Sequence, residues 1–151
     1  MHDTIHPSDD LLEQVALFVD WTCIGRTDHT AVFVERPDTD LDGDELAFRS
    51  RVFDDHPTEA LAGLVAAPTW WAFVLCTTGR AHFLDERDLP AEPIVSTFAR
   101  SRDGHEVSLL RRGQQVARLH GPAEGRVPDL VRAILPARQT TTPTDRADAS
   151  P

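Results

Sequence analysis

Five arginines flank two glycine turns in the second half of the chain, and they offer the clearest chemistry for binding a partner. They are Arg100, Arg102, Arg111, Arg112 and Arg118. Asp-Gly at 103–104 and Arg-Gly at 112–113 predict hairpins, whose pairing would bring several guanidinium groups together. Guanidinium groups bind carboxylates in bidentate pairs, so this arrangement predicts a surface for a protein partner. The alternative is structural, because charged side chains also protect sheet edges and can pair with the acidic first half.

The pair Trp70-Trp71 is a second candidate binding surface, and it follows Pro68 at the start of an apolar run. Neighbouring side chains in a strand face opposite sides of a sheet, so one indole should enter the core while the other faces outward. An outward indole would contact a partner. The alternative is that a helix over residues 57–67 covers it, because large exposed aromatic side chains are uncommon.

The segment 38–43 reads Asp-Thr-Asp-Leu-Asp-Gly and matches the opening of a calcium-binding loop. The twelfth position of such a loop should be a bidentate glutamate, but here it is Arg49. We therefore interpret the segment as a solvated acidic loop and predict no metal site. An acidic calcium-responsive protein that uses residues 38–44 is the alternative.

Catalytic signatures are missing from the sequence. The seven histidines show no HxH or HExxH spacing, no serine lies in a GxSxG frame, and no glycine run has phosphate-loop spacing. We predict no catalytic residues and no cofactor. The alternative is an enzyme or small-ligand-binding protein whose pocket lies inside a curved sheet, with polar groups from Arg49, Arg51, His82 and Arg100.

Length and composition predict one folded domain. The chain has 151 residues, of which 40% are apolar and 26% charged, as in ordinary globular domains. We expect this domain to cover residues 1–136. Residues 137–151 contain no large apolar side chain, so a disordered tail is predicted there.

Charge and targeting signals limit the partners. The net charge of −10 disfavours general binding of nucleic acids. The longest apolar stretch, residues 61–76, is interrupted by Gly63 and Pro68 and is shorter than the roughly 20 residues of a membrane span. The first residues lack a signal-peptide pattern, which predicts a cytoplasmic protein in which Cys23 and Cys76 are buried free thiols. Every basic residue is arginine, and lysine, asparagine and tyrosine are absent, which points to a GC-rich bacterial genome.

Hydrophobic spacing predicts the elements that must position these residues. Helices are expected over residues 8–20, 57–67 and 126–135, and strands over 30–35, 45–53, 70–76, 79–84, 94–98, 107–110 and 116–119. For the first element a strand over 15–24 is the alternative, because valine, phenylalanine, tryptophan and isoleucine crowd there. Thr78-Gly79 is taken as a turn between two strands.

Residues 68–135 resemble the bacterial pleckstrin-homology-like domains. The likeness lies in the strand, turn and strand over 71–84, the strand over 94–98, the hairpin over 106–113 and the closing helix. The resemblance implies a partly open β-barrel that is capped by a C-terminal helix. It also implies a binding or assembly module without catalysis.

Together these observations predict an α+β fold. A strongly bent antiparallel sheet or partly open barrel should be packed by the C-terminal helix and by one or two N-terminal helices. The predicted function is that of a small cytosolic, non-catalytic binding or regulatory protein that acts through contacts with an unidentified protein partner. A homodimer is one form that such contacts could take.

Overall fold

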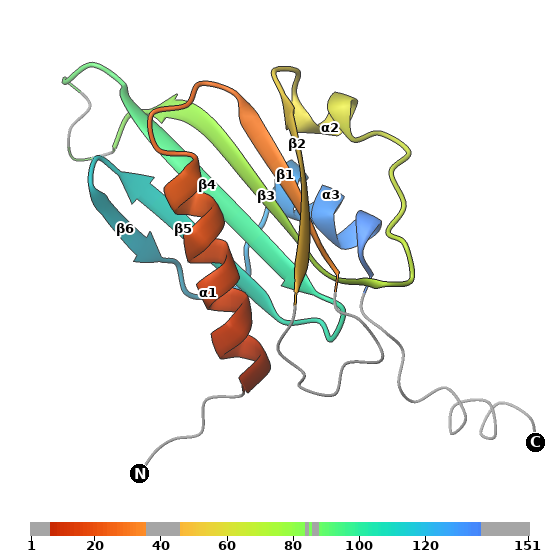
Figure 1. The fold of residues 1–151 in the computed structure, drawn as a ribbon. Coiled ribbons are helices and arrows are strands. Elements are labelled where there is room, and N and C mark those ends of the chain that lie inside the picture. Colours follow the sequence, from red (N-terminus) through yellow and green to blue (C-terminus); the bar gives the residue numbers. More distant parts are fainter. Residues whose placement is uncertain (1–6, 36–45, 84, 86–87, 137–151) are drawn as a thin grey trace, which may run out of the picture.

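The computed structural model describes residues 7–35, 46–83, 85 and 88–136 (Figure 1). The elements are α1 (Pro7–Thr22), β1 (His29–Glu35), β2 (Ala47–Phe53), α2 (Pro57–Ala60), β3 (Trp70–Ala81), β4 (Glu92–Ser101), β5 (Glu106–Arg112), β6 (Gln115–Arg118) and α3 (Arg126–Ile134). The acidic segment 38–44 and the tail 137–151 lie outside the described residues, so the predictions for them stay predictions.

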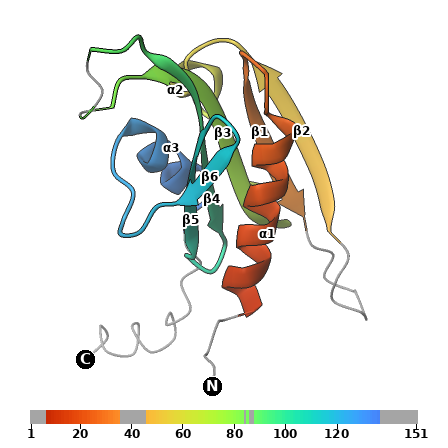
Figure 2. The same ribbon diagram turned by 90° about the vertical axis from the view of Figure 1, so that its left-hand side faces the viewer.

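The six strands form one open antiparallel sheet in the order β2-β1-β3-β4-β5-β6. Helix α1 packs on one side of this sheet and α3 on the other, as Figure 2 shows. We call these two sides the α1 face and the α3 face. The α+β class with an antiparallel sheet and helices near both ends is confirmed, while the strong bend and the barrel stay predictions. Within the described residues, no helix is both long and apolar enough to cross a membrane.

The first two predicted helices had different outcomes. Residues 7–22 form α1, so the helix was correct and the strand alternative over 15–24 was wrong. The helix predicted over 57–67 is only the four-residue α2. Pro57 and the His56 side chain start it, since His56 Nδ1 accepts a hydrogen bond from the Thr58 amide. The chain then turns through Gly63, whose φ of 78° is incompatible with a helix.

Strand β3 replaces two predicted strands. The pairing of β3 with β4 is continuous from Ala72 opposite Ser101 to Ala81 opposite Glu92, so the turn predicted at 78–79 is wrong. Gly79 pairs with Ile94 inside this ladder and has no positive φ. The two other predicted turns are present, with φ of 93° at Gly104 and 64° at Gly113.

A β-bulge at the start of β3 places the two tryptophans on opposite faces. Opposite β1, Val34 pairs with Ala72 but Glu35 pairs with Trp70, so Trp71 is an extra residue in the ladder. Trp71 therefore packs in the same core layer as Ala72, on the α1 face. Trp70 enters the α3 face and stacks on Phe33 with ring centroids 4.4 Å apart.

Two apolar layers fill the core. The α1 face is closed by a helical stripe of α1, namely Leu12, Val15, Ala16, Val19 and Cys23. The α3 face is closed by Leu61 after α2 and by Val131, Ile134 and Leu135 at the end of α3. Cys23 and Cys76 are buried free thiols in the first layer, as predicted.

Candidate functional site

The strand register separates the five arginines of the predicted cluster. Arg100 lies opposite Glu106 beside the turn at 103–104, whereas Arg111 and Arg112 lie opposite Val95 and Ile94 at the other end of the same pair of strands. Because neighbouring residues of a strand alternate between faces, Arg111 lies on the α1 face and Arg112 on the α3 face. The hairpins therefore do not gather these guanidinium groups into one patch.

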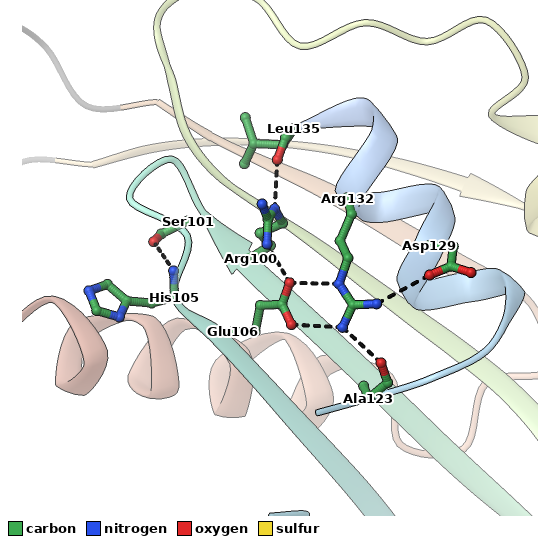
Figure 3. A network of polar contacts seen from close by, with 8 residues as sticks. All are labelled: Arg100, Ser101, His105, Glu106, Ala123, Asp129, Arg132 and Leu135. Carbon is green, nitrogen blue, oxygen red and sulfur yellow. Dashed lines mark hydrogen bonds and ion pairs between the residues drawn. The ribbon is translucent and has the colours of Figure 1, made fainter. Parts of the chain in front are cut away.

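Arg100 belongs to a network that fastens α3 to the sheet (Figure 3). Its Nε donates to the Leu135 carbonyl at 2.7 Å, and its Nη1 pairs with Glu106. Arg132 of α3 donates to both oxygens of Glu106, each at 2.8 Å, and to the Ala123 carbonyl at 2.8 Å. The hydrogen bond from Arg132 is the main reason that the pKa of Glu106 lies below its usual value. This network is structural.

Arg102 and Arg111 are also engaged inside the protein. Arg102 donates from Nη2 to the Ala67 carbonyl at 2.7 Å and from Nε to the Trp70 carbonyl at 3.1 Å, which closes the loop before β3. Arg111 donates twice to Asp20 Oδ2, at 2.9 and 2.7 Å, and Asp20 is fully buried. This pair joins the C-terminal part of α1 to β5.

Arg112 and Arg118 have partners nearer the surface. Arg112 makes a bidentate pair with Glu92 at 2.9 Å and lies 3.8 Å from the centre of the Phe83 ring. Arg118 pairs with Glu13 of α1. All five arginines thus have internal partners, and Arg111 and Arg118 pair with acidic residues of the first half, as the structural alternative predicted.

Trp70 and Trp71 are both buried, at 9% and 8% exposure. Leu61 and Leu64, from the segment after α2, pack in the same layer as Trp70. Neither indole is free to contact a partner without unpacking the core.

Four of the nine large apolar side chains that are exposed in the described residues lie elsewhere, on α1 or directly after it. Beyond its core stripe, α1 exposes Phe18 by 54% and Trp21 by 67%, and Leu17 and Ile24 are exposed beside them. A helix that buries only one side normally carries polar residues on the other. The outer side of α1 is therefore more apolar than its packing in this chain requires.

Strand β2 extends this apolar surface. It is an edge strand, and six of its seven residues are exposed. Phe48 and Val52 lie opposite Val34 and Thr30 of β1, which puts them on the α1 face, with exposures of 46% and 47%. We call Phe18, Trp21, Phe48 and Val52 the α1–β2 patch.

A shallow groove runs between α1 and β2. It has a volume of about 240 Å³ and is lined by Leu11, Gln14, Val15, Phe18 and Phe48. The rings of Phe18 and Phe48 lie across it with centroids 6.1 Å apart. An apolar groove beside an open sheet edge can accept side chains of a protein partner.

This patch was missed from the sequence. The crowding of apolar residues over 15–24 was interpreted only as support for the strand alternative, although it comes from a helix with two apolar sides. A helical projection would have shown the second stripe, because Leu11, Phe18 and Trp21 recur at spacings of seven and three.

A second, larger groove of about 580 Å³ lies on the α1 face, between the segment after α1 and the ends of β3, β4 and β5. Its lining includes Arg26, Arg80 and Arg111, and we call it the arginine groove. Arg26 pairs with Asp28 at 2.8 Å, and Arg80 donates to the Ala91 carbonyl at 2.7 Å.

The pocket predicted from sequence has a different lining. Arg49, Arg51, His82 and Arg100 do not line the arginine groove. Arg49 and Arg100 lie in one row across the α3 face but are separated by Phe33 and Phe73. The structure does not bring the four groups to one cavity in its described part.

The two thiols form a buried pair. A hydrogen bond from Cys76 lowers the pKa of Cys23, while that shared hydrogen bond and burial raise the pKa of Cys76. Cys23 is 1% exposed and Cys76 is fully buried, so access to either sulfur is blocked. Among the described residues, no group of three or more histidine, cysteine, aspartate or glutamate side chains could hold a metal ion.

Comparisons with known proteins returned no match. No protein-family model, no curated protein and no solved structure is detectably similar to this chain.

Proposed function

We propose that this chain is a small protein-binding protein and that the α1–β2 patch is its interface. One observation carries the proposal: four large apolar side chains, from a helix and an edge strand, are about half exposed or more on one face. Large apolar side chains that are exposed close together mostly mark a site of protein contact, and the rings of Phe18 and Phe48 lie 6.1 Å apart. The aromatic residues Phe18, Trp21 and Phe48 belong to the types that dominate binding energy at interfaces.

The proposed interface also fits the non-catalytic, regulatory role that the sequence predicts. Binding through such a patch requires no catalytic residue and no cofactor, and it suits a regulatory or assembly role in a bacterial cytosol. The resemblance to pleckstrin-homology-like domains implies a binding module as well. The predicted arginine and tryptophan surfaces are replaced in this proposal, because their side chains already have internal partners or are buried.

Co-purification from the native host tests the proposal. The tagged chain is compared with a patch variant, Phe18→Ser/Phe48→Ser, and with a control variant, Val65→Ser, and the bound proteins are quantified by mass spectrometry. Val65 is 77% exposed and lies outside the patch, so its variant controls for loss of a surface apolar group. We expect the patch variant to lose a partner that the control keeps. Equal recovery with all three chains would contradict the proposal.

A second candidate function is the binding of a small anionic ligand in the arginine groove. Its volume of about 580 Å³ lies in the range of ligand sites, and its apolar walls include Ile24, Ile94 and Val95. Of its three arginines, Arg26 and Arg111 pair with Asp28 and Asp20, whereas Arg80 has no carboxylate partner among the described residues and would contact the anion. A thermal-shift screen with phosphate and dicarboxylates tests it, with Arg80→Ala as the variant. A rise in melting temperature that Arg80→Ala removes would support this function, and no rise at millimolar ligand would exclude it.

A further inference from the structure

The outer edge of β2 is open for hydrogen bonding. In the described part of the chain, β2 pairs only with β1, along all seven of its residues. Figure 2 shows β2 at the rim of the sheet. The opposite edge strand, β6, has only four residues, and its Arg118 is paired with Glu13. Short edge strands resist strand addition, so β2, with seven residues, is the more accessible of the two edges.

The two faces of β2 differ in chemistry. Phe48 and Val52 lie on the α1 face beside Phe18. Arg49 and Arg51 lie opposite Phe33 and Ala31, which places both guanidinium groups on the α3 face. Within the described residues, neither arginine forms an ion pair, unlike Arg100 of β4, Arg111 and Arg112 of β5 and Arg118 of β6.

The spacing of these arginines matches that of an added strand. Residues two apart on a strand lie roughly 6.6 Å apart on one face. A neighbouring strand has the same period, so acidic residues at alternate positions would lie beside Arg49 and Arg51. Its remaining side chains would then point to the α1 face, toward Phe48, Val52 and the shallow groove.

We propose that β2 binds an extended segment of a partner protein in which acidic and apolar residues alternate, and that this segment adds to the sheet as a further strand. The inference rests on the proposed protein-binding function and specifies the partner's chemistry. Main-chain hydrogen bonds would supply affinity, and the alternating side chains would supply specificity. The pair of arginines would select against basic segments.

A second copy of this chain is a poor occupant for the same edge. Symmetric antiparallel pairing of two β2 strands about Ser50 would place Arg49 of each copy opposite Arg51 of the other. Like charges directly opposite each other on neighbouring strands are destabilising. Charge complementarity therefore favours an acidic partner over a homodimer.

Two synthetic peptides test the inference, with capped ends and the sequences Thr-Val-Glu-Val-Glu-Val-Thr and Thr-Val-Lys-Val-Lys-Val-Thr. Each is titrated into the isotopically labelled full chain, and binding is followed by amide chemical shifts at about 0.15 M salt. We expect the glutamate peptide to bind saturably, to shift the amides of β2, and to bind about tenfold more tightly than the lysine peptide. The chain's net charge of −10 repels the glutamate peptide and attracts the lysine peptide, so it cannot produce this preference.

The charge-reversed variant Arg49→Glu/Arg51→Glu is the matched control. Both positions are exposed, so this variant should fold and should now prefer the lysine peptide. Equal affinity of the two peptides, no saturable binding of the glutamate peptide, or shifts confined to α1 would overturn the inference. Sedimentation provides a further test. If the wild-type chain has the mass of a dimer and Arg49→Glu/Arg51→Glu has the mass of a monomer, the inference is overturned in favour of a homodimer.

Failure of the inference and failure of the proposed function are distinguishable. If Phe18→Ser/Phe48→Ser loses the native partner but the chain binds both peptides equally, the proposed interface is supported and the added acidic strand is excluded. If the patch variant also keeps its partners, both proposals fail.

Discussion

The two faces of the sheet are closed in different ways. On the α3 face, the nine-residue α3 buries Val131 and Ile134, and its Arg132 is held by Glu106. On the α1 face, the sixteen-residue α1 fills the core with one stripe and leaves Phe18 and Trp21 exposed. Among the described residues, α3 leaves no large apolar side chain exposed, whereas α1 leaves several exposed.

Under the proposed function, this difference separates structural residues from binding residues. Charged side chains near the hairpins are the conspicuous feature of the sequence, but they are used to attach α1 and α3 to the sheet. The apolar side chains of the α1–β2 patch have no such use in the fold. We therefore base the proposed interface on the exposed apolar side chains and not on the arginine-rich hairpins.

The largest difference in stability should appear between alanine variants of Trp70, on the α3 face, and Trp21, on α1. Trp70→Ala removes a buried indole that stacks on Phe33 and Phe73, and it should lower the free energy of unfolding by about 3–5 kcal/mol. Trp21→Ala removes an indole that is 67% exposed and should change it by less than about 0.5 kcal/mol. Urea titrations of both variants measure this contrast. Equal losses would show that Trp21 is part of the core.

Breaking the ion pair between Asp20 and Arg111 should give the next largest loss of stability. Asp20→Asn leaves Arg111 without its counter-charge in a mostly buried position, which should cost about 3 kcal/mol of unfolding free energy. The double variant Asp20→Leu/Arg111→Leu removes both charges and should recover most of that loss. Urea unfolding provides the measurement, and a double variant as unstable as the single one would contradict the explanation by charge.

The network around Glu106 predicts a pH dependence for the α3 face. Hydrogen bonds from Arg132 hold the pKa of Glu106 below its unfolded value, so its contribution is present above the unfolded pKa and is lost as the pH falls through the folded pKa. Glu106→Gln should cost about 2 kcal/mol at pH 7. The difference between wild type and variant should shrink as the pH is lowered below the unfolded pKa of a glutamate. A difference that stays constant with pH would assign the loss to packing.

The smallest change in stability is expected from removing the Arg118–Glu13 ion pair at the edge strand β6. Arg118 and Glu13 are both more than a third exposed, and such pairs contribute about 0.2–1 kcal/mol. Arg118→Ala should therefore change stability little and should leave recovery of the native partner unchanged. If the variant lost the partner at unchanged stability, the binding surface would extend to the arginine-bearing hairpin.

Periodic apolar spacing predicted most of the elements because it reflects which side of each element is buried. It located α1, α3 and the strands around the turns at Gly104 and Gly113, where positive φ requires glycine. It failed at Thr78-Gly79, since an unbroken ladder to β4 overrides a local turn preference. It also predicted too long a helix at α2, because the chain leaves the helix after Ala60 and turns through Gly63 with a positive φ.

The candidate site was harder to predict, because pairing partners are distant in sequence. The Asp20–Arg111 pair joins residues 91 positions apart, and nothing local shows that Arg111 is already occupied. The bulge at Trp71 likewise depends on the register with β1, and both indoles are buried on opposite faces, although one was predicted to face outward. The patch itself needs both α1 and β2, which meet only through the fold.

Site-specific photo-crosslinking in the native host tests the interface most directly. A photoreactive phenylalanine derivative is placed at Trp21 or Phe48 in the patch, and at Val65 or Leu89 outside it, since all four positions are exposed. We predict crosslinks to the same partner protein from positions 21 and 48 and none from positions 65 and 89. Crosslinks that are absent from the patch, or equally frequent at all four positions, would contradict the assignment of the α1–β2 patch as the binding surface.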